Sequence, residues 1–261
     1  MNPITVPSQS SLTGGAVAVG GGTAGASRGL ELERLVTLSA PAMEDLYRQL
    51  DSPTTTVLLA DSRGGVLRAI GSGHEDGVSP TATGALSRAS AARTASAGHD
   101  ASAALPARTP TQRVGIAVPI LPPDGGLLGF VDSDASPLDW LSHANALLQT
   151  AARIIEHRLI ETEPRGFLLL RFHRYPTVLG TPLEALALLD ADGGVLLANR
   201  IAIDLLAPAP LSCGVAVASC FTTQWCGIVG YAALGLRQPF VLRDHRGTDF
   251  SARASLRRAT A

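Results

Sequence analysis

The sequence predicts an α+β protein of two tandem domains, each an antiparallel sheet flanked by helices, joined by a long helix. The main observation is a pattern that occurs four times: an apolar run, a turn with Asp or Gly, and a second run. The copies are residues 57–69, 118–131, 186–199 and 240–254. Asp and Gly tolerate the left-handed backbone of a tight hairpin, and the flanking residues favour strands. Two copies precede the longest predicted helix and two follow it, which predicts two small domains.

The N-terminal part predicts a tail followed by the first domain. Residues 1–29 are mostly Gly, Ser, Thr and Ala and contain too few large apolar side chains to form a core. We therefore expect a disordered tail. We place the first domain at residues 30–162, beginning with two short helices, the second of which starts near Pro41. Within it, residues 74–113 form a low-complexity stretch of Ala, Ser, Thr, Gly, Pro and Arg. A connection of this length is either functional or disordered.

The clearest helix is predicted at Leu138–Glu161. Ser136 and Pro137 provide a typical start, and apolar residues follow at alternating spacings of three and four. This stripe consists of Leu141, Ala144, Leu148, Ala151 and Ile155. It has two interpretations: the seam of a homodimer that also transmits a signal, or a face that packs on the sheet of its own domain. We favour the dimer seam.

We place the second domain at residues 163–261. Residues 167–172 predict a buried strand, and residues 199–206 predict a helix after the third hairpin. Asn199 stands at that corner, where its side chain is expected to hydrogen-bond the backbone in a structural role. Cys213, Cys220 and Cys226 follow without a metal-ligand spacing, so we expect buried free thiols, whose role the sequence does not define.

Composition excludes several classes of function. All 21 basic residues are Arg, so a P-loop ATPase and Schiff-base chemistry, which both need Lys, are excluded. The formal net charge of −1 disfavours direct nucleic-acid binding and attachment to an anionic membrane. No apolar run has the length of a membrane span, and no signal peptide is visible, which predicts the cytoplasm.

Reactive side chains do not gather in a pattern that predicts catalysis. His143 and His157 lie outside the apolar stripe of the long helix and are expected to be exposed. The Asp residues of the four hairpins are explained by turn formation. We therefore predict no enzyme, no metal site and no cofactor. His173 and His245 lie near strands, where a haem ligand could stand, but a haem site is disfavoured.

Three segments carry a resemblance to a known family. The string LLDADGGVLLANRIAIDLL resembles the opening of a PAS domain. Residues 41–70, 114–160 and 166–206 together resemble the N-terminal GAF–PAS sensory region of bacterial sigma-54-dependent transcription activators of the acetoin-catabolism-regulator type, in the Fis family. The chain lacks that family's ATPase and helix-turn-helix domains. Residues 74–113 stand where the family builds one wall of the GAF pocket.

The resemblance implies a signal-sensing module of a transcription regulator. Such a module binds a small-molecule effector or a partner and relays the change through a dimerising helix. The alternative is a degenerate relic that binds no small molecule and acts only by dimerising with an intact regulator. A small enzyme is the least favoured reading.

Overall fold

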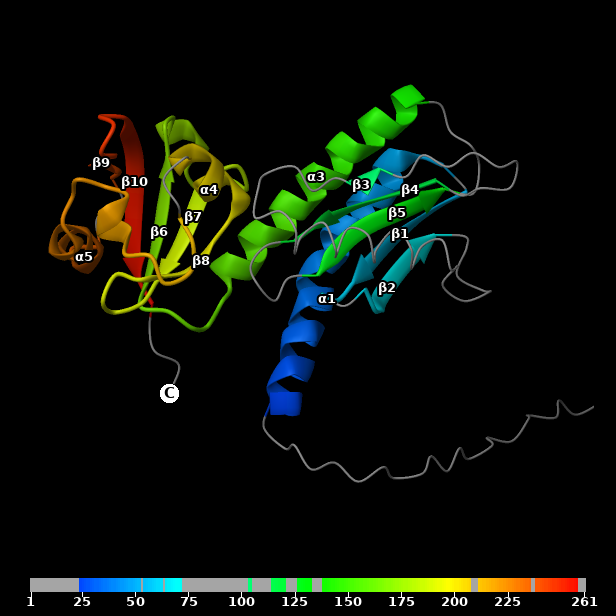
Figure 1. Cartoon of the computed structure of the whole chain (residues 1–261), viewed down its shortest axis with the longest axis horizontal. Helices are drawn as coiled ribbons and strands as arrows, with labels where there is room; N and C mark the ends of the chain where they lie inside the picture. The colour runs from blue at the N-terminus through cyan, green and yellow to red at the C-terminus, as the bar shows by residue number, and fades with distance from the viewer. Residues whose placement is uncertain are drawn as a thin grey trace, which may run out of the picture.

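A computed structural model describes residues 24–52, 54–62, 64–71, 103–104, 114–120, 126–132, 138–207, 211–235 and 238–257. Figure 1 shows two sheets side by side, with one long helix running between them. The predicted fold class is confirmed: the chain is α+β, with two antiparallel sheets and flanking helices. Among the described residues, no helix has both the length and the apolar character needed to cross a membrane.

The first half contains helix α1 and five strands, followed by the long helix α3. The elements are α1 (Ala24–Leu50), β1 (Thr55–Ala60), β2 (Val66–Gly71), β3 (Ala103–Ala104), β4 (Val114–Pro119), β5 (Leu127–Asp132) and α3 (Leu138–Glu161). The strand order is β2-β1-β5-β4-β3, and every pairing is antiparallel. The two predicted hairpins of this half are β1–β2 and β4–β5, and they pair directly through β1 and β5.

The second half contains a second sheet with two short helices. Its elements are β6 (Leu168–His173), η1 (Pro176–Val178), β7 (Ala185–Leu189), β8 (Val195–Ala198), α4 (Arg200–Leu206), η2 (Val217–Ser219), α5 (Trp225–Ala233), β9 (Phe240–Arg243) and β10 (Asp249–Leu256). The strand order is β8-β7-β6-β10-β9, again fully antiparallel. Here β6 lies between the two predicted hairpins, so the two halves are not copies of one topology.

The hairpin turns are held by their own aspartates. Oδ1 of Asp61 accepts a hydrogen bond from the Gly65 amide at 2.7 Å, and Oδ1 of Asp190 accepts one from the Gly194 amide at 2.7 Å. Asp244 accepts from the Thr248 amide at 2.8 Å in the β9–β10 turn. These bonds explain the aspartates as turn residues. Asp124, in the remaining turn, lies outside the described residues.

Helix α1 corrects two details of the expectation. It is one helix from Ala24 to Leu50 with Pro41 inside it, where two short helices were predicted. Met43 and Leu46 are buried against the first sheet together with Leu35, so packing on both sides of Pro41 outweighs the loss of one backbone hydrogen bond. Because the helix begins at Ala24, residues 24–29 do not belong to a disordered tail. Residues 1–23 lie outside the described residues, as do most of residues 74–113.

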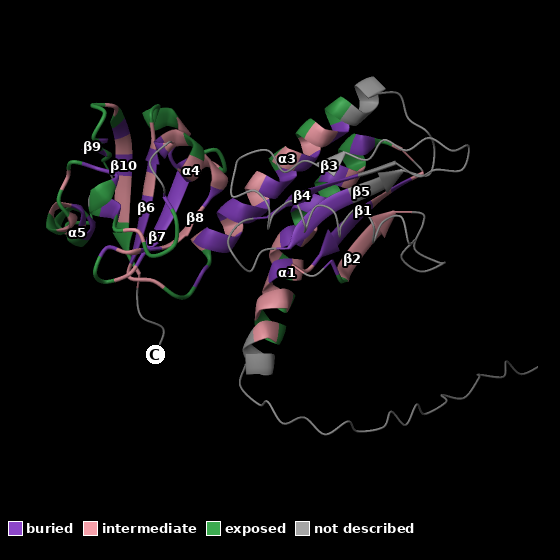
Figure 2. Cartoon of the chain, viewed as in Figure 1, coloured by how far each residue is buried: buried purple, intermediate pink, exposed green. Residues whose placement is uncertain are grey.

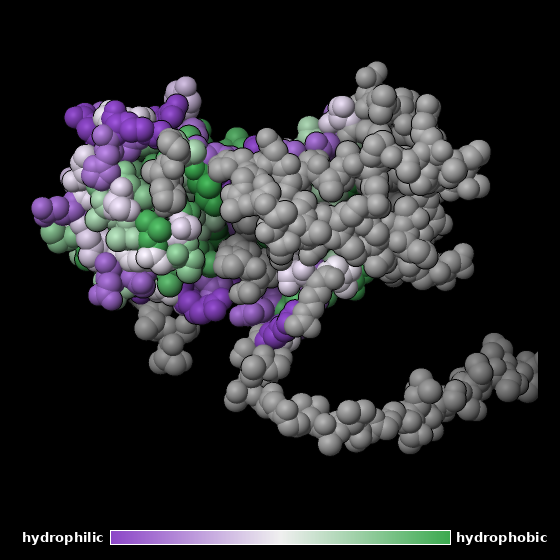
Figure 3. Space-filling model, in the orientation of Figure 1, coloured by the Kyte–Doolittle hydropathy of each residue, from purple (hydrophilic) through white to green (hydrophobic). Residues whose placement is uncertain are grey.

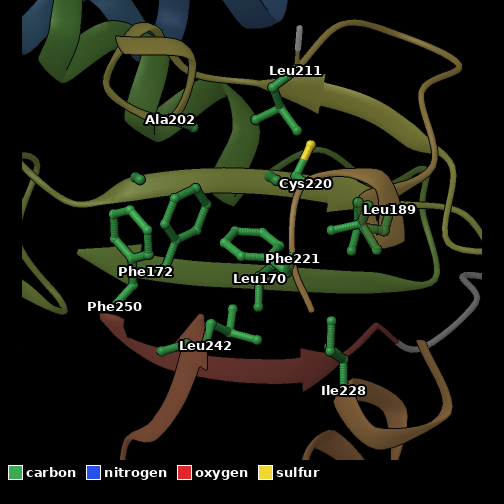
Figure 4. Packing of buried hydrophobic residues seen from close by; sticks show 14 of the residues in the cluster. Leu170, Phe172, Leu189, Ala202, Leu211, Cys220, Phe221, Ile228, Leu242 and Phe250 are labelled. Atoms are coloured by element: carbon green, nitrogen blue, oxygen red, sulfur yellow. The ribbon is translucent and has the colours of Figure 1, made fainter. Parts of the chain in front are cut away.

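Each half has its own apolar core, coloured as buried in Figure 2. The second core centres on Phe172, Phe221 and Phe250, which pack edge to face at centroid distances of 5.4, 5.7 and 6.2 Å. Figure 4 shows these rings side by side over the sheet, with Leu170 and Leu242 next to them. The rings therefore occupy the space between the second sheet and its helices. The exact domain boundary at residues 162–163 stays a prediction.

Candidate functional site

Helix α3 contacts both halves, and the site lies where it meets the second sheet. The N-terminal part of α3 covers the first sheet, and its C-terminal end lies beside the second half (Figure 1). Ile160, fully buried, packs with Leu186 and Leu188 on the face of the second sheet that lies opposite the phenylalanine core. One helix is thus part of two apolar clusters.

The apolar stripe of α3 faces its own half. Ala144, Leu148, Ala151 and Ile155 are all buried in the core that α1 and the first sheet form. A residue already covered within its own chain is not available to a second copy, so these four residues do not form an exposed dimer seam. The alternative that the sequence left open, packing on the helix's own sheet, describes them. The side chain of Leu141 lies outside the described residues.

A buried carboxylate, Glu184, is the centre of the polar contacts between α3 and the second sheet. Its side chain has no exposed surface. Its Oε1 atom lies 3.0 Å from Nε2 of His157 and also accepts a short hydrogen bond from the guanidinium of Arg171. Its Oε2 atom accepts the Gly180 amide at 2.6 Å. Arg171 also donates to Glu161 at 2.7 Å, so it connects β6 both to Glu184 and to Glu161 of α3.

The electrostatics of this group favour its charged form. Burial alone would raise the pKa of Glu184, but the hydrogen bonds from His157 and the Gly180 amide and the charge of Arg171 together lower that pKa. Burial would lower the pKa of Arg171, but its contacts with Glu161 and Glu184 raise it. Glu184 and Arg171 are therefore a tightly held ion pair under the second sheet.

His157 was expected to be exposed, and the structure corrects this. It is buried, with 7% of its side chain exposed, because the second sheet covers this turn of α3. Its Nδ1 atom lies 3.8 Å from Glu161, one helical turn further along. The sequence contained one signal for this contact: His157 and Glu161 are four residues apart on one helix face. The partner Glu184, 27 residues away, could not be inferred. His143 is exposed.

Two further ion-pair groups connect the halves. Arg34 of α1 donates to Glu163, after the end of α3, at 2.5 Å, and Glu163 also accepts Nε of Arg165 at 2.7 Å. Arg200 of α4 lies 3.6 Å from Glu156 of α3 and donates to the Pro119 carbonyl of β4 at 3.0 Å. Figure 3 shows hydrophilic residues at the lower end of the visible boundary between the halves, next to α1, and hydrophobic residues higher up. The contact between the halves therefore combines these ion pairs with the apolar packing of Ile160 on the second sheet.

Asn199 lies at the corner between β8 and α4, next to the backbone of Glu184. Its Oδ1 accepts the Leu186 amide at 3.0 Å and the Ala202 amide at 2.9 Å, which makes it the N-cap of α4. Its Nδ2 donates to the Glu184 carbonyl at 2.9 Å. Asn199 thereby fixes the backbone on which the buried carboxylate stands.

An open cavity of about 550 Å³ lies beside the polar contacts. It is lined by Glu161, Arg171, Gly180, Ala232, Gly235, Arg253, Ala254, Ser255 and Leu256. Two of these, Glu161 and Arg171, also belong to the group around Glu184. The cavity therefore opens onto the contact between α3 and the second sheet.

The cysteines are distributed differently from the expectation. Cys220 is buried in the second core, where burial raises the pKa of its thiol. Cys213 and Cys226 are exposed, which corrects the prediction of buried thiols: Cys213 lies in a turn, and Cys226 lies in the first turn of α5, whose buried residues are Ile228 and Ala232. Among the described residues, no group of three or more His, Cys, Asp and Glu side chains is arranged to hold a metal ion.

No protein-family model matches this chain, and no curated protein matches it either. Among solved structures, the chain is similar to the E. coli DhaR(N)–DhaL complex, with 14% sequence identity, a TM-score of 0.38 and coverage of 90% of both chains. It is also similar to MglB in a tetrameric arrangement, with 16% identity, a TM-score of 0.32, and coverage of 47% of this chain and 90% of that one.

Proposed function

We propose that this chain is a regulatory sensing module without catalytic activity, in which α3 links the state of one half to the state of the other. The observation that carries the proposal is that α3 belongs to both halves. Its Leu148 and Ile155 lie in the first core, and its His157 lies against Glu184 of the second sheet. A displacement of the second sheet therefore acts on the helix that covers the first.

The resemblance in sequence to GAF–PAS sensory regions supports the same proposal and names its context. On that basis the module belongs to a transcription regulator of the sigma-54-dependent type and responds to a small effector or a partner. It does not contact nucleic acid itself. A homodimer remains part of the proposal, but its interface lies outside the four buried residues of the α3 stripe. An effector shifts such a module only by binding its two states with different affinity.

Hydrogen exchange tests the link between the halves. Phe221→Leu removes part of a fully packed ring from the second core, and the experiment follows amide protection in β1 and α1 of the first half. Faster exchange in these elements supports the proposal. In the double variant Phe221→Leu with Glu184→Gln, the faster exchange should be confined to the second half. Unchanged protection in the first half of the single variant contradicts the proposal.

A second function has one observation in its favour. Phe172, Phe221 and Phe250 fill the second core, which favours a relic that binds no effector there and acts only by dimerising with an intact relative. Light scattering together with thermal melting across a metabolite panel separates the two functions. A dimer whose melting temperature no metabolite changes favours the relic, and a metabolite-dependent rise favours the sensor.

A further inference from the structure

The cavity beside α3 contains a pair of like charges that face each other across two strands. Arg253 of β10 and Arg171 of β6 are register partners in the antiparallel ladder. Side chains at such positions lie on one face about 5 Å apart, and two like charges there destabilise the sheet. Arg171 is neutralised by Glu161 and Glu184. Arg253 makes no ion pair with any residue in the described part of the chain, and its Nε atom is buried without a hydrogen-bond partner.

The surroundings of Arg253 are positive. Arg257 directly follows β10, and burial together with the charge of Arg171 lowers its pKa. Of the three arginines, Arg171 contacts the carboxylates of Glu161 and Glu184, whereas Arg257 donates to the backbone carbonyls of Ile160 and Glu161. A guanidinium presents a planar pair of N–H donors that fits the two oxygens of a carboxylate. The site therefore has a positive charge and a donor geometry for one anion.

The other wall of the cavity is apolar. Strand β9 pairs with β10 only as far as Ala252, so the following residues of β10 extend past it. Ala254 and Leu256, whose side chains point to the face of β10 away from Arg253, line the cavity at this open edge together with Ala232 of α5. Leu256 is 42% exposed, which is high for a leucine in a strand. A volume of about 550 Å³ lies in the range of small-molecule sites.

We infer that this cavity binds a small organic acid across the open edge of β10, with its carboxylate paired with Arg253 on one face and its hydrocarbon part against Ala254 and Leu256 on the other. The inferred site rests on the cavity and its lining residues and does not depend on the proposed function. Its consequence rests on the proposed function: the ligand sits next to Arg171, the residue that connects β6 to Glu161 of α3. The organic acid is then the effector of the sensing module, and its binding changes the contact between the two halves.

Calorimetry on the full chain tests the site with hexanoate as the probe. Hexanamide has the same hydrocarbon part without the charge, and inorganic phosphate is an anion without a hydrocarbon part. We expect saturable binding of hexanoate and at least tenfold weaker binding of both comparison compounds. Absence of saturable hexanoate binding overturns the inference, and phosphate bound as tightly as hexanoate overturns the assignment to an organic acid.

Two variants locate the binding. Arg253→Gln should weaken hexanoate binding at least tenfold, and Arg253→Lys, which keeps the charge without the planar fork, should weaken it less. Arg243→Gln is the matched control, because Arg243 is an exposed arginine of the same sheet that pairs with Asp249. Equal binding by Arg253→Gln and Arg243→Gln overturns the site.

The two proposals fail separately. Hexanoate that binds through Arg253 without changing hydrogen exchange in β1 and α1 leaves the site standing and contradicts the sensing function. Exchange that responds to Phe221→Leu in a chain that binds no hexanoate leaves the link between the halves standing and contradicts the site.

Discussion

Nε2 of His157 lies 3.0 Å from the carboxylate of Glu184, and this contact joins the C-terminal part of α3 to the residue that precedes β7. Both side chains are buried, with exposed fractions of 7% and 0%. Arg171 completes the group from the neighbouring strand. A buried carboxylate with a hydrogen-bonded and an ionic partner is stable only while all of them are in place, so the group responds strongly to small displacements.

Glu184→Gln should therefore destabilise the protein more than an ordinary surface change does. Removing the charge leaves Arg171 buried beside one remaining carboxylate, and breaking a buried ion pair costs about 3–5 kcal/mol. The measurement is the free energy of unfolding in urea. Glu44→Gln is the control, because Glu44 pairs with Arg68 at 3.2 Å but is 53% exposed, and a cost of about 0–1 kcal/mol is expected. Equal losses in the two variants would show that the buried group contributes no more than a surface pair.

Stability should fall in acid through Glu184 and Glu163. The pKa of each is lowered in the folded state from an ordinary value of 4.5. A carboxyl with a depressed folded pKa contributes stability above its unfolded pKa, and that contribution is lost as the pH falls through the folded value. We expect the urea midpoint to decrease from about pH 4.5 downward. In Glu184→Gln the decrease should be smaller, and an identical pH profile in both proteins would contradict the assignment.

Leu148→Asp should unfold the first half and should not merely separate a dimer. Leu148 is fully buried in the core of its own chain, so a charge placed there has no solvent and no partner. Circular dichroism should show lost helix signal, whatever the oligomeric state in light scattering. His143→Asp, on the exposed side of the same helix, should leave both unchanged. A folded monomer of Leu148→Asp, from a dimeric parent, would restore the dimer-seam interpretation.

Gly193 and Gly247 form a matched pair for the turn geometry. Both have positive φ, 85° and 83°. A Cβ on Gly193 would lie 2.9 Å from the Trp225 ring, whereas one on Gly247 would meet nothing within 4 Å. We expect Gly247→Ala to cost about 1–2 kcal/mol through the backbone alone. Gly193→Ala should cost about 1–3 kcal/mol more through the displaced ring, which Trp225 fluorescence would report. Equal costs would mean that the ring moves away without loss.

Local patterns predicted much of this fold, because the features involved are local. The four Asp/Gly hairpins depend on turn residues that bond their own backbone, as Asp61 and Asp190 do. The long helix was predicted to its final residues from its cap and its apolar spacing. Asn199 stands out in the sequence as a polar residue between an apolar strand and an apolar helix.

The candidate site could not be predicted, because the contacts that bring His157 and Arg171 to Glu184 join distant segments. Glu184 follows an exposed, irregular stretch and reads as a surface residue, yet the strand it precedes carries it under α3. The pairing of Arg253 with Arg171 depends on β10 lying next to β6 in the sheet. The strand order is set by the tertiary fold, and the local residue pattern does not predict it. Pro41 led to the wrong prediction of two short helices. A proline usually interrupts a helix, but here packing on both sides of Pro41 outweighs that local effect.

Unfolding followed separately in each half tests most directly whether α3 makes the two halves one cooperative unit. The chain has two tryptophans, Trp140 at the start of α3 and Trp225 in α5, so Trp225→Phe reports on the first half and Trp140→Phe on the second. We expect coincident urea transitions in these two proteins, and we expect them to separate when Glu184→Gln is added to each. Transitions that are already separate with Glu184 intact, and that do not move further apart without it, would show that α3 does not couple the two halves.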